Sequence, residues 1–256
     1  MRYVDFIERN VGEYERPSLL AAALDGGTLA RLAALRPQQD WRCLEIGAGI
    51  GTVSTWLAGQ CPDGEVTATD IDTELLAGAV PPSVRVLRHD VTTDDFPEGS
   101  FDLIFSRWVF THLPDRGRIL SKAARWLAPG GRLVLEDAAD LAGDTRPPLT
   151  RQLFQAAWPM ALALVGTDRT WAEEFPEPLA RAGLCRLELA ADLPVAAPGT
   201  PMLRMLLITL ELFRQPMIDA GAISAADFDA AIKEMTGPDF RALGFTTISA
   251  CGRRPA

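Results

Sequence analysis

A glycine-rich segment and a carboxylate further along the chain are the residues with the clearest chemical potential. Residues 45–51 read Glu-Ile-Gly-Ala-Gly-Ile-Gly, and Asp70 follows 19 residues after Gly51. Glycine lets the backbone turn tightly and approach a ligand closely. A carboxylate at the position of Asp70 can accept hydrogen bonds from two ribose hydroxyls. Together they predict a site for a cofactor that contains a nucleoside, either nicotinamide or adenosyl.

The spacing of the glycines separates these two cofactor classes. The segment follows the pattern Gly-x-Gly-x-Gly, whereas a dinucleotide fingerprint places its third glycine one residue later. Thr52 occupies that later position. The spacing therefore disfavours a nicotinamide-dependent oxidoreductase.

Short apolar runs and amphipathic helices alternate after Trp41 and would position these residues. The expected strands are 43–46, 66–69, 84–87, 101–105 and 132–135, and the expected helices begin near 52, 73 and 114. Strands that alternate with helices predict a parallel sheet with helices on both faces and right-handed crossovers. Ligands bind at the carboxyl ends of such strands, which is where both the glycine segment and Asp70 fall.

The remaining parts of the chain are helix-rich and less regular. A helix is expected at 171–182, a sixth strand at 184–189 and a seventh at 245–250, with an insertion over about 201–241 between them. Residues 1–36 read as helical, and Gly26-Gly27 is expected to separate two helices. We therefore predict a helical N-terminal cap at 1–36 and one α/β domain at 37–256 that carries a helical lid insertion.

On these motifs the chain resembles the class I S-adenosylmethionine-dependent methyltransferases, especially their small-molecule branch. The segment CLEIGAGIG (43–51) is similar to the first motif of the family, and VTATDID (66–72) is similar to its acidic second-strand motif. The segment 88–115 resembles the third and fourth motifs, and WLAPGGRLVLED (126–137) resembles the fifth-strand motif. The resemblance implies a Rossmann-like, seven-stranded, mostly parallel sheet and S-adenosyl-L-methionine as cofactor.

The resemblance also assigns roles by position. Asp70 would bind the ribose hydroxyls with Ile71 against the adenine face, while Asp90 would accept from the adenine amino group and Val91 would offer backbone contacts. The residues that would line or adjoin the methionine and ribose part are Glu45, Gly47, Ala48, Gly49, Gly51, Ser106 and Arg107.

A methyl transfer needs alignment of the acceptor, exclusion of water and, for some acceptors, a base. His112, after the fourth strand, is the candidate base, and its alternative role is to cap the following helix. Trp108 and Phe110 line either a substrate pocket or the core. Tyr14 is either a latch over the cofactor or a packing residue.

The segment 202–213 is apolar on nearly all sides, which is typical of a helix buried from several directions. It predicts either a lid, with Met202 and Met205 as adaptable pocket residues, or a subunit interface of a homodimer. The apolar segment 153–164 is its expected partner.

Composition excludes several other classes. The net charge is −9, which disfavours a nucleic-acid partner. The apolar stretches are shorter than the roughly 20 residues that span a bilayer, so no membrane partner is expected. Four scattered cysteines favour a reducing cytoplasm and no metal site. The acidic residues after the fifth strand are expected to be solvated rather than to bind a metal.

These features predict an enzyme that moves a methyl group in line from S-adenosylmethionine to a small, largely apolar acceptor. The expected acceptor is a natural-product intermediate, with oxygen as the first acceptor atom, then nitrogen or carbon. The alternative is a protein that uses the same pocket for a non-methylating, cyclase-type reaction or as a binding subunit.

Overall fold

The computed structural model describes residues 15–141 and 145–256, and these form two compact units. The sheet unit comprises residues 25–137, 171–191 and 248–256. The helical unit comprises 15–24, the described part of 138–170, and 192–247. The helical cap predicted at residues 1–36 and the lid insertion predicted at about 201–241 stay predictions.

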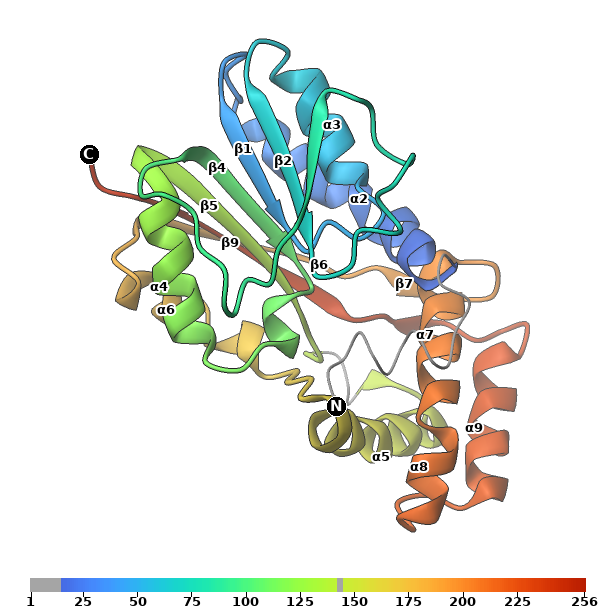
Figure 1. The fold of residues 1–256 in the computed structure, drawn as a ribbon. Helices are drawn as coiled ribbons and strands as arrows, with labels where there is room; N and C mark the ends of the chain where they lie inside the picture. The colour runs from blue at the N-terminus through green and yellow to red at the C-terminus, as the bar shows by residue number, and fades with distance from the viewer. Residues whose placement is uncertain (1–14, 142–144) are drawn as a thin grey trace. The chain divides into compact units, whose positions relative to one another are not determined.

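The sheet has seven strands in the order β3-β2-β1-β4-β5-β9-β6 (Figure 1). The pairs β3-β2, β2-β1, β1-β4 and β4-β5 are parallel. This confirms the predicted Rossmann-like α/β fold with a seven-stranded sheet. The strands are β1 (Arg42–Ile46), β2 (Glu65–Asp70), β3 (Val84–Arg88), β4 (Phe101–Arg107), β5 (Leu127–Ala139), β6 (Cys185–Asp192) and β9 (Thr246–Arg253).

Helices α2 (Glu15–Ala34) and α3 (Thr52–Gln60) bury apolar residues against the sheet. Leu32 of α2 and Leu57 of α3 are fully buried in one cluster with Cys43 of β1 and Val66 of β2. Burial of each such side chain contributes roughly 1.5–3 kcal/mol. The shared core fixes the glycine segment between β1 and α3. The other helices of the sheet unit are η1 (Phe110–His112), α4 (Arg116–Trp126), η3 (Trp171–Glu174) and α6 (Glu177–Arg181).

The helical unit is built around α5 (Pro148–Val165), which packs against α8 (Arg214–Asp219) and α9 (Ala225–Thr236). Glu234 of α9 caps α5, because its Oε2 accepts hydrogen bonds from the backbone N–H of Thr150 at 2.8 Å and from its hydroxyl at 2.6 Å. The unit also contains α7 (Pro201–Leu212), β7 (Val195–Ala196) and β8 (Ala242–Leu243).

Helix α7 contains the apolar segment that the sequence predicts to be either a lid or a subunit interface. Five of its apolar side chains are buried within this chain: Met202, Leu203, Met205, Leu206 and Leu210. They are covered without a second copy of the chain, so their burial gives the homodimer prediction no support.

Three expectations about helices are wrong. The single helix expected at 171–182 is divided into η3 and α6, because Pro176 between them cannot donate a backbone hydrogen bond. Gly26-Gly27 does not separate two helices, because α2 runs without a break from Glu15 to Ala34. Side-chain contacts from both ends of α2 outweigh the roughly 1 kcal/mol that each glycine costs a helix. Residues 74–79 form turns rather than a helix. The carboxylate of Asp72 accepts the N–H of Glu74, and this local bond favours a turn.

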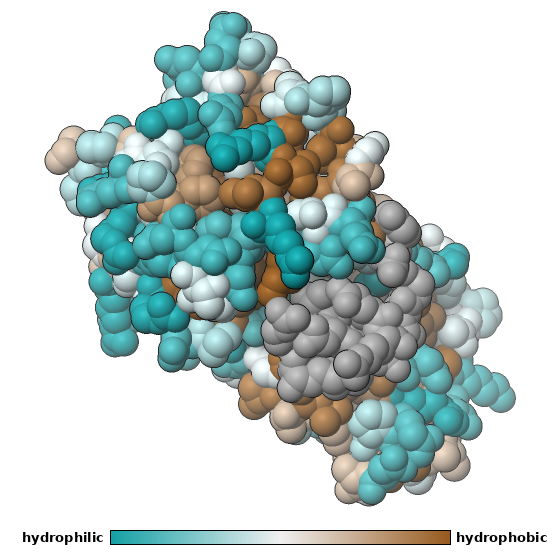
Figure 2. Space-filling model, in the orientation of Figure 1, coloured by the Kyte–Doolittle hydropathy of each residue, from teal (hydrophilic) through white to brown (hydrophobic). Residues whose placement is uncertain are grey.

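The face drawn in Figure 2 is mostly hydrophilic, with apolar residues gathered in small groups. Within residues 15–141 and 145–256, no helix combines the length and the apolar character needed to cross a membrane.

Candidate cofactor site

The glycine segment turns sharply at the carboxyl end of β1. Gly47, Gly49 and Gly51 all have positive φ, at 70°, 56° and 73°. The N–H groups of Gly47 and Ala48 donate to the carbonyl of Thr69 at 2.8 and 2.9 Å, which ties the turn to β2. A Cβ on Gly47 would lie 2.2 Å from Cγ2 of Val109, so only glycine fits there without a shift.

Gly49 and Asp70 meet at the tip of this turn. The N–H of Gly49 donates to Oδ2 of Asp70 at 2.9 Å. Burial raises the pKa of Asp70, and the N–H bond of Gly49 opposes that rise. A Cβ built on Gly49 would meet no described atom within 4 Å, so none of the described residues fills the space in front of the turn. A half-buried carboxylate beside an open glycine turn is a fitting cradle for a ribose.

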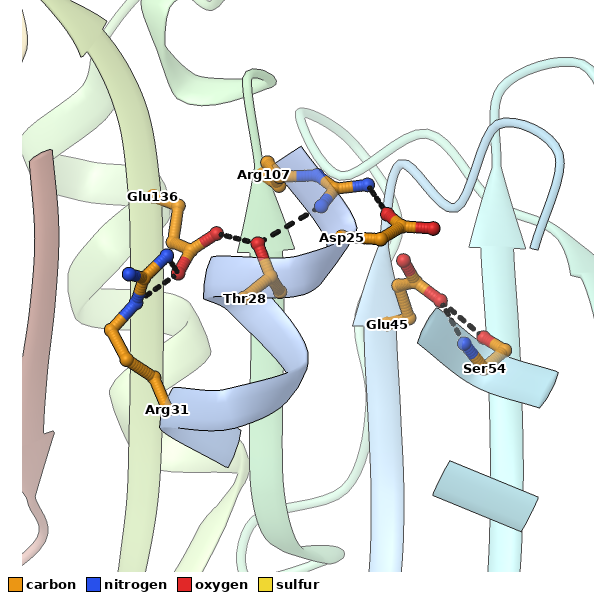
Figure 3. Close-up of polar contacts among 7 residues, drawn as sticks. All are labelled: Asp25, Thr28, Arg31, Glu45, Ser54, Arg107 and Glu136. Carbon is orange, nitrogen blue, oxygen red and sulfur yellow. Dashed lines mark hydrogen bonds and ion pairs between the residues drawn. The ribbon is translucent and has the colours of Figure 1, made fainter. Parts of the chain in front are cut away.

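Glu45 lies beneath the turn and is buried (Figure 3). Its Oε2 accepts a 2.7 Å hydrogen bond from the N–H of Ser54 in α3, and the Ser54 hydroxyl donates to the same oxygen. Burial raises the pKa of Glu45 to about 7, although the bonds from Ser54 and the charge of Arg107 pull the pKa down. Glu45 therefore joins β1 to the start of α3 directly below the turn.

The predicted adenine-side residues follow the neighbouring strands. The N–H of His89 donates to the carbonyl of Asp70 at 2.9 Å, which joins the ends of β2 and β3. One oxygen of Asp90 accepts from Thr92, at 2.9 Å from its N–H and 2.6 Å from its hydroxyl. Val91 is buried. The carbonyl of Ile71 accepts from Arg88 at 3.0 Å.

Ser106 and Arg107 end β4, the strand next to β1. The Ser106 hydroxyl donates to the carbonyl of Ile46 at 3.1 Å, so it supports the turn from below. The Arg107 guanidinium pairs with Asp25 at 2.8 Å and donates to the Thr28 hydroxyl at 2.9 Å (Figure 3). Arg107 is thus held by helix α2, a contact that the family motifs do not contain.

Three residues of α2 form a polar network that the sequence reasoning missed. The Thr28 hydroxyl donates to Oε2 of buried Glu136 at 2.6 Å, and Arg31 donates to Oε1 of the same carboxylate at 2.9 Å (Figure 3). Together with Asp25 they are spaced three residues apart, which places them on one face of the helix. That spacing is a signal in the sequence, although it does not identify the partners.

The candidate base and pocket residues are placed as follows. His112 is partly exposed at the end of η1, just after β4. Trp108 and Phe110 are buried beside it, and Trp108 has a positive φ of 56°. Met202 and Met205 are buried in α7 of the helical unit. Tyr14 lies outside the described residues. The roles of these residues stay predictions.

Two of the acidic groups expected to follow the fifth strand have protein partners, although Glu136 lies within β5 and only Asp140 comes after it. Glu136 bonds to Thr28 and Arg31, and Asp140 forms an ion pair with Arg146. In the described ranges, no group of three or more His, Cys, Asp or Glu side chains is arranged to hold a metal ion. Glu136 is buried rather than solvated, because the network with α2 supplies its partners.

The other histidine, His89, packs into an aromatic group away from the turn. Its ring stacks on Phe96 with a centroid distance of 4.6 Å and meets Trp126 edge-on at 5.8 Å. Burial lowers the pKa of His89.

Comparison with known proteins agrees with this geometry. The family described as "Methyltransferase domain" matches residues 44–135. Methyltransferase str3 of Strobilurus tenacellus is 36% identical over 108 residues, which cover 42% of this chain and 39% of that protein. Demethylmenaquinone methyltransferase of Deinococcus radiodurans is 30% identical over 158 residues, covering 57% of this chain and 66% of that protein.

A solved structure extends the likeness in fold beyond the matched segment. Phosphoethanolamine N-methyltransferase 2 of Haemonchus contortus, in complex with phosphomonomethylethanolamine and S-adenosylhomocysteine, superposes with a TM-score of 0.62 at 19% identity. The superposition covers 100% of this chain and 61% of that one. The chain therefore spans about two fifths of str3 and about three fifths of this structural neighbour.

The sheet order, the glycine turn and the carboxylate that ends β2 define a Rossmann-like fold with a site suited to a cofactor that contains a nucleoside. Together with the match of residues 44–135 to the methyltransferase domain, these features support a class I S-adenosylmethionine-dependent methyltransferase. S-adenosylmethionine is accordingly its cofactor.

Proposed function

We propose that the chain transfers a methyl group from S-adenosylmethionine to a small, largely apolar acceptor, an intermediate in the biosynthesis of a natural product. The observation that carries this proposal is the bond between Gly49 and Asp70 at an open turn. It orients the carboxylate that, in this proposal, binds the hydroxyls of the ribose. Enzymes of this class work mainly by alignment and exclusion of water.

Residues of the sheet unit would hold the cofactor. Asp70 would accept the ribose hydroxyls, Asp90 the adenine amino group, and the turn from Gly47 to Gly51 would pass under the methionine part. Buried Glu45 and Ser106 keep that turn in place through Ser54 and the carbonyl of Ile46. The bound cofactor supplies a methyl group on a positively charged sulfur, which becomes a neutral thioether once the methyl has left.

The acceptor would attack the methyl carbon in line with the carbon–sulfur bond. A lone pair of the acceptor forms the new bond to carbon, and the pair of the broken bond stays on sulfur. For a hydroxyl acceptor, our first choice of atom, the proton would pass to the imidazole of His112. Nitrogen and carbon are our second and third choices. His112 follows β4 at the carboxyl edge of the sheet, the edge that carries the cofactor residues.

An apolar acceptor suits the residues that follow β4. Trp108 and Phe110 are large, buried and next to His112, and aromatic side chains commonly line pockets for apolar ligands. The name of the Deinococcus relative also refers to an apolar acceptor, a quinone, whereas the Haemonchus neighbour is named for a charged one. We propose that this chain acts on the apolar kind.

Calorimetric titration with S-adenosylmethionine, S-adenosylhomocysteine and NADH tests the site. We expect micromolar binding of the two adenosyl ligands and none of NADH. Transfer is then tested with methyl-labelled cofactor against panels of phenols, quinols and amines, with Asp70→Ala as the control for background. Binding of NADH alone would contradict the proposal. Binding of the adenosyl ligands without labelled product from any panel would favour the cyclase-type or binding-subunit alternative.

A further inference from the structure

Helix α2 places a carboxylate at the edge of the sheet that carries the glycine turn. Oδ1 of Asp25 accepts a 2.8 Å hydrogen bond from Nη2 of Arg107, which ends β4. Figure 3 shows the Asp25 carboxylate between Arg107 and Glu45, and the charges of Asp25 and Arg107 both act on the Glu45 carboxyl group. Glu45 lies in β1 just before the turn. All three residues belong to the sheet unit, so they form one group of charges beside the turn.

The Arg107 guanidinium is held in place but keeps donors to spare. Its Nη1 donates to the Thr28 hydroxyl at 2.9 Å, and that hydroxyl donates to Oε2 of Glu136 at 2.6 Å. With the bond to Asp25, described residues use two of the five N–H donors of the guanidinium. The side chain is 10% exposed. Arg107 can therefore still donate to a carboxylate of a ligand.

The two carboxylates beside Arg107 also have unused acceptors. Within residues 15–141 and 145–256, Asp25 accepts hydrogen bonds through Oδ1 and Glu45 through Oε2, whereas Oδ2 of Asp25 and Oε1 of Glu45 accept none. Burial raises the pKa of Glu45 to about 7, so a cation beside it would stabilise its ionised form. An ammonium group fits these acceptors, because it brings a positive charge and three N–H donors.

We propose that Asp25 binds the α-ammonium group of the methionine part of S-adenosylmethionine, with Glu45 as a second acceptor and Arg107 at the α-carboxylate. Both charges of that part are borne on one carbon, which suits acceptors and donors that lie side by side. Asp25 comes from α2, outside the segment 44–135 that matches the methyltransferase domain. The assignment rests on the cofactor and not on the acceptor named in the proposed function.

Calorimetric titration of the full chain with three adenosyl ligands tests the assignment without any methyl transfer. S-adenosylhomocysteine carries the complete amino-acid end, S-adenosyl-3-thiopropylamine keeps only the ammonium, and 5′-methylthioadenosine lacks both charges. We expect Asp25→Asn to weaken binding of the first two about 10-fold, because a charge-assisted hydrogen bond to the ammonium is lost. Binding of 5′-methylthioadenosine should stay within about two-fold, which also shows that the variant is folded.

Asp102→Asn is the matched control. Asp102 also pairs with an arginine of the sheet unit, Arg42 at 3.1 Å, and its side chain is 27% exposed against 24% for Asp25. It lies at the start of β4, whereas Arg107 ends that strand. Asp102→Asn should therefore change none of the three affinities by more than about two-fold. The unaltered chain adds a test that needs no variant, since it should bind the propylamine about 10-fold more tightly than 5′-methylthioadenosine.

Three results would overturn the assignment. Equal losses for all three ligands in Asp25→Asn, or no loss for any, would make the pair with Arg107 purely structural. A loss confined to S-adenosylhomocysteine would mean that Asp25 acts through Arg107 on the carboxylate and does not bind the ammonium. Equal affinities of the unaltered chain for the propylamine and 5′-methylthioadenosine would exclude an ammonium site. If the expected pattern appears and no methyl transfer is found, only the proposed function fails.

Discussion

The backbone N–H of Gly49 donates a 2.9 Å hydrogen bond to Oδ2 of Asp70, so the turn after β1 orients the carboxylate that ends β2. The two residues are brought together by the parallel pairing of these strands, in which Ile46 lies opposite Thr69. The carboxylate is thereby oriented before any ligand arrives. This preorganisation lowers the cost of binding.

Replacing Asp70 by Ala should weaken binding of S-adenosylmethionine about 10- to 100-fold. Charge-assisted hydrogen bonds of this kind contribute roughly 1.5–3 kcal/mol. Calorimetry measures the effect. Asp63→Ala is the control, because Asp63 is an exposed aspartate near the opposite end of β2. Equal affinities of the Asp70 variant and the wild type would remove Asp70 from the site.

Replacing Gly47 by Ala should destabilise the fold by about 3 kcal/mol. Positive φ costs an L-residue roughly 1–2 kcal/mol, and the new Cβ would also meet Val109 at 2.2 Å. Gly99→Ala should show only the cost of positive φ, since Gly99 has a φ of 74° and no described atom would lie within 4 Å of a Cβ there. Urea unfolding measures both variants. Adding Val109→Ala should restore part of the loss, and no restoration would argue against the contact.

Glu45 should make stability depend on pH. Its folded pKa of about 7 lies above the ordinary 4.5. Its stabilising contribution is therefore fully present below pH 4.5 and is lost as the pH rises through 7. Glu45→Gln stays neutral, so its unfolding free energy relative to wild type should rise by about 3 kcal/mol from pH 4.5 to 8. Denaturant titrations across that range measure it. The exposed control Glu74→Gln should show no such trend. A difference in unfolding free energy between Glu45→Gln and wild type that does not change with pH would contradict the raised pKa of Glu45.

Replacing His112 by Ala should lower kcat about 100-fold or more if the acceptor is a hydroxyl, because general bases contribute roughly 10²–10⁴. The affinity for S-adenosylmethionine should stay within two-fold. His89→Phe is the control, since phenylalanine keeps the stacking on Phe96. Single-turnover rates over a pH range measure the effect. Full activity of His112→Ala at every pH would make that residue structural.

Most of the sheet could be predicted because alternating apolar runs and glycine turns are local signals. β3, for example, covers Val84–Arg88 where a strand at 84–87 is expected. Residues 74–79 form turns instead of the expected helix, because the hydrogen bond that the Asp72 carboxylate accepts from the N–H of Glu74 competes locally with a helix. The continuity of α2 could not be predicted, because it depends on partners such as Thr209, almost 200 residues away in sequence.

In the candidate site, too, local motifs could be predicted from the sequence and long-range contacts could not. The turn at Gly47 to Gly51 and the carboxylate of Asp70 are recognisable from one short stretch of sequence. The partners of Arg107 are not, since Asp25 lies 82 residues earlier in a segment without a family motif. A motif assigns a residue to an edge of the sheet, whereas its ion pairs depend on whichever helix covers that edge.

The place of β9 in the sheet determines when the sheet can be completed as the chain is synthesised. This strand is the last of the seven in sequence, yet it lies between β5 and β6. The residues of β6 and of all the helices in the 201–236 segment emerge from the ribosome before residues 246–253. The gap between β5 and β6 must stay open during that time, with unpaired strand edges exposed. The sheet therefore closes late in synthesis, and a nascent chain that stalls before residue 246 should be prone to aggregation.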